Sequence, residues 1–360
     1  MPPMPTIDSD AHVVETEHTW DYLEPADMKY RPAIVRPAGE SAREYWLIDG
    51  KIRGLARQVI TAQQFEAISQ RAGRRMDTPQ ATRDMENVPA RLDHMDRLGV
   101  DIQVLYPTIF IEQVSDNPDI EIALCKAYNR WLADLWRQGQ GRLRWICMLP
   151  FLAMDVALEE LQFAKDHGAC GVFMRGFEGP RPITDPYFFP LYERMAAEKL
   201  AVGVHVGNGN PWLADAVSKF NGGGSFMRFR VPVFGAFWSV IQAEVPRQFP
   251  DLHFHFAEAA AQWIPYLLKD LRRRWSAQGK RLPDYPMKDY NLYVACQTDD
   301  DVAYILGYSG EDNLVIGTDY GHNDQSTDIE AVATLREQGA ISASQFEKIV
   351  YHNPKALFAL

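Results

Sequence analysis

Short apolar runs alternate with amphipathic stretches along most of the chain. Eight of the runs are nearly continuous in Val, Ile and Leu, as expected for parallel strands that are buried on both faces. These runs cover residues 6–12, 102–107, 143–150, 171–175, 202–206, 252–258, 292–297 and 314–320. Apolar residues recur at helical spacing in the stretches between them, which are 119–138, 155–167, 186–198, 233–248, 262–276 and 299–308. Strands and helices that alternate in this way predict an α/β fold, a closed (β/α)8 TIM barrel.

An open, doubly wound sheet is the other architecture that this alternation allows. No Gly-x-Gly-x-x-Gly motif follows the first apolar run, and its absence favours the barrel. A length of 360 residues suits one barrel, so we expect a single domain over 1–360.

Two segments are longer than a strand-to-helix connection needs. Residues 13–95 predict an insertion that caps the barrel, with a β-hairpin over 45–53 that turns at Asp49-Gly50. Residues 207–231 contain Asn221-Gly-Gly-Gly-Ser225, which suits either a mobile lid or a flexible connector. Residues 326–360 predict C-terminal helices that close the bottom or edge of the barrel.

Side chains of the metal-binding type stand at the ends of apolar runs. Asp10 and His12 are two residues apart on a predicted strand and therefore point to the same side. His205, Glu258 and Asp319 end three later runs. The carboxyl ends of barrel strands meet at one face. A single histidine in an apolar run is usually a core residue, but five converging groups predict a divalent-metal site, since buried carboxylates need partners.

Composition excludes several classes of partner. A net charge of −11 argues against a nucleic-acid ligand, and Arg272-Arg-Arg274 suits the exposed face of a helix. The four cysteines are far apart and form no Cys-x-x-Cys pair, which argues against a zinc–thiolate site and fits a reducing cytoplasm. We find no signal-peptide pattern and no apolar stretch of membrane-spanning length. The sequence therefore predicts a cytoplasmic protein without a membrane partner.

Six motifs occur in a defined order along the chain. They are Ile7-Asp-Ser-Asp-Ala-His-Val-Val-Glu15, Ala90-Arg-Leu-Asp-His-Met-Asp-Arg-Leu-Gly-Val100, Val202-Gly-Val-His-Val-Gly207, Phe256-Ala-Glu-Ala-Ala-Ala-Gln-Trp-Ile-Pro265, Ile316-Gly-Thr-Asp-Tyr-Gly-His322 and Asn353-Pro-Lys-Ala-Leu-Phe358. Together they resemble the amidohydrolase superfamily, in the branch of aminocarboxymuconate-semialdehyde decarboxylase. The resemblance covers nearly the whole chain. It implies a barrel metalloenzyme that acts on a small molecule and is often a homodimer.

The resemblance also implies roles for the five candidates. Asp10 and His12 occupy the position of the family's His-x-His ligands, and His205 matches its strand-five histidine. Asp319 matches a strand-eight aspartate that is both a ligand and a general base. Glu258 stands where this branch often has a histidine, and we expect it to be a ligand or a second acid/base group. No lysine at the end of the fourth run is available as a carbamylated bridge.

Three carboxylates and two imidazoles make a donor set rich in oxygen. Such a set favours Mn or Fe relative to a histidine-rich zinc site, so the expected cofactor is one or two ions of Zn, Mn or Fe. The leading interpretation is hydrolysis or non-oxidative decarboxylation of a small cyclic or aromatic carboxylated compound, with Asp319 moving the proton. A nonheme diiron monooxygenase and a non-catalytic binding barrel are the alternatives.

Further residues are candidates for contact with the substrate. Arg175 suits a bidentate grip on a carboxylate, and a structural ion pair is its alternative role. His322 is expected to orient Asp319 or to touch the substrate. Aromatic side chains are expected to line an apolar pocket or to pack in the core or lid, and they are Phe110, Trp212, Phe226 and Trp263. No role is assigned to His253 or His255.

Overall fold

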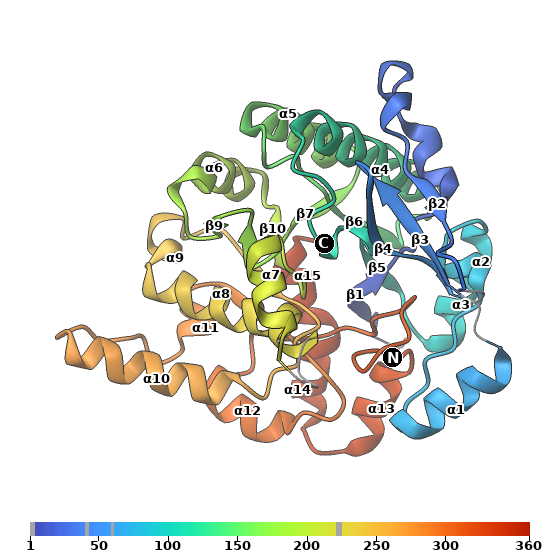
Figure 1. The fold of residues 1–360 in the computed structure, drawn as a ribbon. Coiled ribbons are helices and arrows are strands. Elements are labelled where there is room, and N and C mark those ends of the chain that lie inside the picture. Colours follow the sequence, from blue (N-terminus) through green and yellow to red (C-terminus); the bar gives the residue numbers. More distant parts are fainter. Residues whose placement is uncertain (1–3, 40–42, 59–60, 221–224) are drawn as a thin grey trace.

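The computed structural model describes residues 4–39, 43–58, 61–220 and 225–360 (Figure 1). One eight-stranded parallel sheet has the order β1-β5-β6-β7-β10-β11-β12-β13. Its strands are β1 (Ile7–His12), β5 (Ile102–Tyr106), β6 (Leu143–Cys147), β7 (Ala169–Met174), β10 (Ala201–Val204), β11 (Phe254–Phe256), β12 (Leu292–Cys296) and β13 (Leu314–Ile316). They coincide with the eight apolar runs, which confirms the predicted TIM barrel.

The last strand returns to the first beside the candidate metal ligands. The backbone N–H of Asp319 donates to the Asp10 carbonyl at 2.8 Å, and the N–H of His12 donates to the Tyr320 carbonyl at 2.7 Å. These bonds join the segment after β13 to β1, so the sheet closes at its carboxyl end. The open doubly wound sheet is therefore ruled out.

Helices lie around the outside of the sheet (Figure 1). They are α4 (Pro118–Gln138), α5 (Met154–Asp166), α6 (Phe189–Glu198), α8 (Val231–Gln242), α9 (Val245–Gln248), α10 (Ile264–Ala277), α11 (Pro286–Asp289) and α12 (Val302–Ser309). The continuous helix expected over 233–248 is instead split into α8 and α9. Pro246 explains the break, because proline has no N–H to donate to the preceding turn. Glu244 adopts a left-handed φ of 55° at this break.

The segment after β1 folds into a small sheet and several helices. Its elements are the helical turns η1 (Glu17–Tyr22) and η2 (Pro25–Tyr30), strands β2 (Ala33–Val35), β3 (Arg43–Ile48) and β4 (Lys51–Gln58), and helices α1 (Ala62–Ala72), α2 (Gln80–Arg83) and α3 (Val88–Leu98). β3 and β4 pair antiparallel, and Asp49 and Gly50 turn between them with φ of 51° and 67°. Two successive positive φ values suit a tight hairpin turn.

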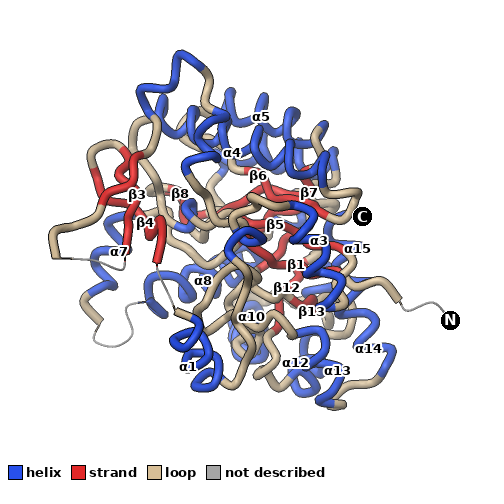
Figure 2. Tube along the Cα trace, turned by 90° about the vertical axis from the view of Figure 1, so that its right-hand side faces the viewer, coloured by secondary structure: helices blue, strands red, loops and turns tan. Residues whose placement is uncertain are grey.

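The hairpin, α1 and α7 (Pro211–Ser218) lie at one end of the barrel in Figure 2. Most of the described part of 207–231 is helical: α7 is followed by the π-helical turn η5 (Phe226–Arg230). Asn210 caps α7 by accepting the N–H of Leu213 at 2.9 Å. The predicted glycine-rich lid centre falls on 221–224, which lies outside the described residues.

Helix α15 lies at the opposite end of the barrel from the hairpin (Figure 2). The C-terminal elements are α13 (Ala331–Gln338), α14 (Ala343–Glu347), η6 (Lys348–His352) and α15 (Asn353–Phe358). Asn353 anchors α15 by donating to the carbonyls of Glu311 and Leu314 at 2.9 and 2.7 Å. Short elements complete the chain, namely η3 (Ile109–Ile111), η4 (Pro186–Phe188), β8 (Phe177–Glu178) and β9 (Arg181–Pro182). Within the described ranges, none of the helices has both the length and the apolar character needed to cross a bilayer.

Candidate metal centre

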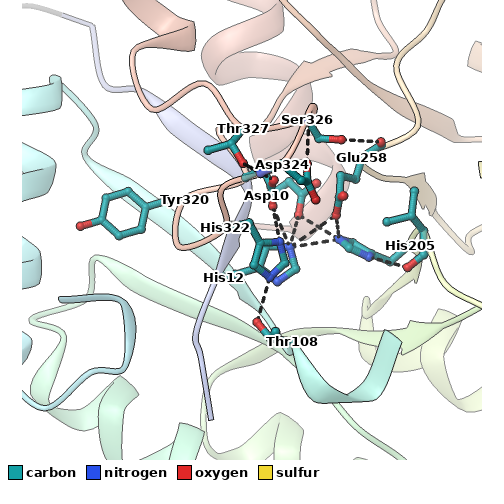
Figure 3. Close-up of polar contacts among 12 residues, drawn as sticks. Asp10, His12, Thr108, His205, Glu258, Tyr320, His322, Asp324, Ser326 and Thr327 are labelled. Carbon is teal, nitrogen blue, oxygen red and sulfur yellow. Dashed lines mark hydrogen bonds and ion pairs between the residues drawn. The ribbon is translucent and has the colours of Figure 1, made fainter. Parts of the chain in front are cut away.

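The five predicted ligands converge at the carboxyl end of the barrel. Figure 3 shows four of them, Asp10, His12, His205 and Glu258, pointing toward one another. Asp10 and His12 come from β1, while His205, Glu258 and Asp319 follow β10, β11 and β13. The two Nε2 atoms of the histidines are 3.2 Å apart, and Asp10 Oδ1 lies 3.5 and 3.4 Å from them. Glu258 Oε2 is 3.1 Å from His205 Nε2, and Asp319 Oδ1 is 3.5 Å from His12 Nε2. All five side chains are buried.

The two histidines present their Nε2 atoms to this point. His12 Nδ1 lies 3.0 Å from the Pro107 carbonyl and His205 Nδ1 lies 2.9 Å from the Val206 carbonyl. A carbonyl only accepts hydrogen bonds, so Nδ1 carries a hydrogen in both rings and Nε2 is the nitrogen that faces the cluster. Burial lowers the pKa of His205, but Asp10 and Glu258 outweigh burial and hold that pKa well above its ordinary value, so Nε2 of His205 must give up a hydrogen before it can bind a metal ion. This is the arrangement that metal-binding histidines adopt.

The donor set fits a divalent ion. Asp10 Oδ1 and Glu258 Oε2 are buried and accept no hydrogen bond within the described structure. An ion with bonds of about 2.0–2.2 Å separates its donors by about 3.0–3.6 Å, which is close to the distances given above. A second group of donors overlaps with the first, because His12, Glu258, Asp319 and His322 also bring ligand atoms within 4.8 Å of one another. The residues present can therefore hold one or two ions.

Electrostatics in the cluster favour a cation. Burial lowers the pKa of His12 to about 3, and the neighbouring His322 lowers it further. Burial raises the pKa of Glu258 and of Asp319, and each of these carboxyls also experiences other negative charge nearby. Burial would also raise the pKa of Asp10, but His205 and His12 outweigh it and leave that pKa below its ordinary value. Buried carboxylates that repel one another are stabilised by a divalent ion.

The backbone is strained at two of the carboxylates. Glu258 and Asp319 have φ of 59° and 51°, in the left-handed region that non-glycine residues rarely adopt. Such a residue costs of the order of 1–3 kcal/mol and persists only where the surroundings impose it. Both residues lie just beyond the end of a strand.

A tight contact and a buried carboxylate hold β13 against β1 below the cluster. A Cβ atom on Gly317 would lie 2.4 Å from the Cβ of Asp10, so only glycine fits at this approach. Asp8 accepts hydrogen bonds from the N–H and the hydroxyl of Thr318 at 2.9 and 2.5 Å, and from the Gln103 amide at 3.0 Å. No pattern in the sequence indicated these roles for Asp8 and Gly317.

The protein-family model described as "Amidohydrolase" matches residues 7–360, which is nearly the whole chain. The chain belongs to the amidohydrolase family. This result confirms the resemblance found in the sequence motifs. No curated protein is similar enough to this sequence to count as a relative.

Solved structures of this amidohydrolase fold resemble the chain over its full length. An amidohydrolase from Mycobacterium avium subsp. paratuberculosis superposes with a TM-score of 0.80 at 19% identity, covering 100% of this chain and 99% of its own. A 5-carboxyvanillate decarboxylase from Sphingomonas paucimobilis gives 0.68 at 16%, covering 99% and 100%. A 2,6-dihydroxybenzoate decarboxylase from Rhizobium gives 0.65 at 15%, covering 99% of each chain. At these identities the likeness establishes the fold.

His322 lies against Asp319 in this amidohydrolase. Its Nδ1 is 2.7 Å from Asp319 Oδ1, and its Nε2 is 2.9 Å from the Thr108 hydroxyl oxygen. That hydroxyl donates its hydrogen to the Val13 carbonyl at 2.7 Å, so it accepts from His322. Both ring nitrogens then carry hydrogen, which makes His322 an imidazolium. Burial lowers its pKa, but Asp319 outweighs burial and raises the pKa to about 9.

The hydrogen bonds that orient Asp319 include one that no sequence pattern indicated. Thr327 donates its hydroxyl hydrogen to Asp319 Oδ2 at 2.7 Å (Figure 3). Thr327 and Thr108 both lie in loops beyond strand ends, where residues follow no period. The sequence therefore contained no signal for either contact.

The structure places Arg175 in the ion pair that was the alternative to its substrate role. The side chain is buried, its Nε and Nη2 donate to the two carboxylate oxygens of Glu178, and its Nη1 donates to the Phe110 carbonyl at 3.0 Å. Glu178 lies in the short strand β8, three residues further along the chain. These acceptors engage all three guanidinium nitrogens.

The four predicted aromatic residues lie in different settings. Trp212 is 77% exposed on α7, and Phe226 is about half exposed at the start of η5. Trp263 packs against Phe234 and Phe237, with ring centroids 5.2 and 4.9 Å apart. Phe110 is buried against Tyr128 in the core. Phe110 and Trp263 therefore pack against other aromatic rings, and a pocket-lining role stays a prediction for all four residues.

His255, left without a role in the sequence analysis, lies inside the barrel beneath the cluster. Its Nδ1 is 2.7 Å from the Tyr106 hydroxyl, and the Tyr106 ring stacks on the His205 imidazole with centroids 5.1 Å apart. His255 and Glu258 are not related by strand alternation, because β11 ends at Phe256 and Glu258 has a left-handed backbone. Side chains alternate only while the backbone stays extended. His253 lies outside the cluster, with its Nδ1 3.0 Å from the Leu357 carbonyl.

Proposed function

We propose that this amidohydrolase-family protein is a metal-dependent enzyme that decarboxylates or hydrolyses a small cyclic or aromatic carboxylated compound. One observation carries the proposal: the Asp319–His322 pair lies at the edge of a donor set that fits a divalent ion. His322 also borders a cavity of about 310 Å³, near the lower end of the range for small-molecule sites. Decarboxylation is the first reaction to test, because two of the similar structures are decarboxylases of aromatic carboxylic acids by name.

Asp10, His12 and His205 would hold the ion, with Glu258 as a further ligand. When bound, it would polarise a substrate carboxylate or carbonyl, or acidify a water molecule. Asp319 would hold the proton that moves, since burial raises its pKa and its carboxylate is within hydrogen-bond reach of donors on both oxygens.

In decarboxylation, Asp319 delivers the proton to the ring carbon that loses the carboxylate. In hydrolysis, Asp319 takes a proton from the attacking water. His322, held by Thr108, keeps its Nδ1 2.7 Å from Asp319 Oδ1 in either case.

The decisive experiment compares wild-type protein with Asp319→Asn after loading with Mn, Fe or Zn. A panel of aromatic mono- and dicarboxylic acids, lactones and cyclic amides is incubated with each form, and products are identified by mass spectrometry with carbon dioxide release measured in parallel. We expect turnover that depends on metal and is lost in Asp319→Asn, while the variant still folds. Near-normal turnover in that variant would exclude Asp319 as the proton carrier, and failure to bind any metal would support a non-catalytic barrel.

A nonheme diiron monooxygenase is the second candidate. Its support is the pair of overlapping donor groups, which share His12 and Glu258 and include three carboxylates. Elemental mass spectrometry on protein prepared without chelator or affinity nickel separates the two candidates. About two Fe per chain together with substrate-dependent oxygen uptake favours the oxygenase, and one Mn or Zn per chain favours the hydrolase or decarboxylase.

We also propose that the protein is cytoplasmic and forms a homodimer. Light scattering coupled to gel filtration tests the dimer, and symmetric dimers are the commonest soluble oligomers.

A further inference from the structure

The backbone of Tyr320 belongs to the candidate metal centre, but its side chain points away from it (Figure 3). Tyr320 directly follows Asp319, and its carbonyl accepts the N–H of His12 at 2.7 Å. Asp319 lies beyond the end of β13 with a strained, left-handed φ of 51°, which persists only where its surroundings impose it. The contacts of the buried Tyr320 side chain therefore bear on two candidate ligands.

The Tyr320 hydroxyl is held by two hydrogen bonds, one from each of helices α2 and α3. The Thr82 hydroxyl donates its hydrogen to the Pro79 carbonyl at 2.7 Å, so its oxygen accepts the hydrogen of Tyr320 at 2.7 Å. The Tyr320 oxygen then accepts a hydrogen bond from His94 Nδ1 at 2.6 Å. Thr82 and His94 are both buried, so these bonds are shielded from water.

The guanidinium of Arg91 covers the face of the Tyr320 ring. Its central carbon lies 3.7 Å from the ring centroid, and the side chain is fully buried, which strengthens the attraction of a cation to an aromatic face. Both terminal nitrogens of Arg91 donate to the His12 carbonyl at 3.3 Å. Arg91 and His94 are three residues apart on α3 and project from one face of this helix. Arg91 thus joins β1 to the segment that follows β13.

We propose that Tyr320 is a positioning residue, whose side chain is clamped by α2 and α3 and thereby fixes Asp319 beside the metal-binding histidine of β1. We call this arrangement the Tyr320 tether. Ligands and proton carriers must be held within about 0.5 Å of their working positions by the residues behind them. The tether rests on the proposed function for the chemistry of the metal centre. It gives a role to the motif at residues 90–100, which the proposed function leaves without one.

Tyr320→Phe tests the tether, because it removes the hydroxyl and keeps the ring that Arg91 covers. Full-length protein is freed of metal and loaded with Co²⁺, whose affinity is measured by chelator competition and whose visible absorption reports its coordination geometry. We expect Co²⁺ affinity to fall about 10- to 100-fold and the absorption spectrum to change, because a residue that supports the ligands has lost its anchor.

Tyr192→Phe is the matched control. Tyr192 is also fully buried, and its hydroxyl donates to the Ile183 carbonyl at 2.5 Å. Thermal unfolding of the metal-free proteins is measured in parallel. The control is expected to lose stability as Tyr320→Phe does, since each variant loses a buried hydrogen bond, and to retain the spectrum and the Co²⁺ affinity of the wild type.

Two substitutions of His94 test the hydrogen bond from α3. His94→Asn keeps an N–H near the position of Nδ1, whereas His94→Leu has no donor. We expect His94→Leu to lower Co²⁺ affinity about three- to tenfold, as the loss of one hydrogen bond implies, and His94→Asn to stay within about twofold of the wild type.

Unchanged Co²⁺ affinity and spectrum in Tyr320→Phe would overturn the tether while leaving the proposed function intact. An equal loss of affinity in Tyr192→Phe would overturn it as well, because general destabilisation would then explain the effect. Equal affinities of His94→Asn and His94→Leu would exclude the hydrogen bond from α3 as part of it. A wild type that bound no Co²⁺ would refute the proposed function together with the tether, whereas failure to find the reaction leaves these measurements unaffected.

Discussion

Gly317→Ala tests whether the approach of β13 to β1 positions the metal ligands. An alanine Cβ at residue 317 would lie 2.4 Å from the Cβ of Asp10 and 3.4 Å from both the Cα and the backbone nitrogen of Asp10. Non-bonded carbons prefer about 3.5–4.0 Å, so the two strands must separate by about 1 Å at this point. The overlap is between atoms close to the backbone, and rotation of a side chain cannot relieve it.

The expected magnitude follows from that displacement. Overpacking a well-packed site costs about 1–3 kcal/mol in the free energy of unfolding. Asp10 moves with its strand, and disturbing the support of a ligand typically lowers metal affinity about 10- to 100-fold. A misplacement of about 1 Å also lowers turnover about 100-fold. We therefore expect a moderate loss of stability and a much larger loss of metal binding and activity.

The assay is metal affinity by chelator competition, with thermal unfolding of the metal-free protein measured in parallel. Gly235→Ala is the matched control: residue 235 lies in α8, and a Cβ there meets nothing within 4 Å. That control is expected to retain metal affinity and to gain about 0.5–1 kcal/mol of stability, because alanine favours a helix interior. If Gly317→Ala bound metal as tightly as the wild type, the position of Asp10 would not depend on this contact.

Three further predictions follow from the same structure. His205→Ala is expected to lose bound metal as measured by elemental mass spectrometry, and full occupancy would remove His205 from the ligand set. Arg175→Met leaves the buried Glu178 without its partner and is expected to lower the free energy of unfolding by about 3–5 kcal/mol in denaturant titrations; unchanged stability with a raised KM would restore a substrate role. Burial raises the pKa of Glu15 to about 7, although the N–H groups of Ile109 and Thr108 oppose this shift. A carboxyl with a raised pKa in the folded state stabilises the protein below its unfolded pKa, and this contribution is lost as pH rises through about 7. Relative to wild type, Glu15→Gln should therefore gain about 3 kcal/mol between pH 4.5 and 8, and parallel pH profiles would refute this.

The periodicity of the sequence determined the barrel and the convergence of its five candidate ligands. Val, Ile and Leu recur in eight runs because each strand is buried on both faces. Asp10 and His12 share a face because side chains alternate in an extended strand. The other three ligands could be placed because parallel strands of a barrel end at the same face. Each of these inferences uses a local rule or a rule of barrel topology.

Only the tertiary structure decided what surrounds the ligands. The Arg175 guanidinium is paired with Glu178, because β8 places that carboxylate beside it. His322 carries a hydrogen on Nε2, because the Thr108 hydroxyl already donates its own hydrogen to the Val13 carbonyl. Apart from the Arg175–Glu178 pair, whose members are three residues apart, these contacts join loops that are distant in sequence and have no repeating backbone geometry. Periodic patterns therefore identify the candidate metal-binding residues, while packing between loops determines their protonation, their supports and the residues around them.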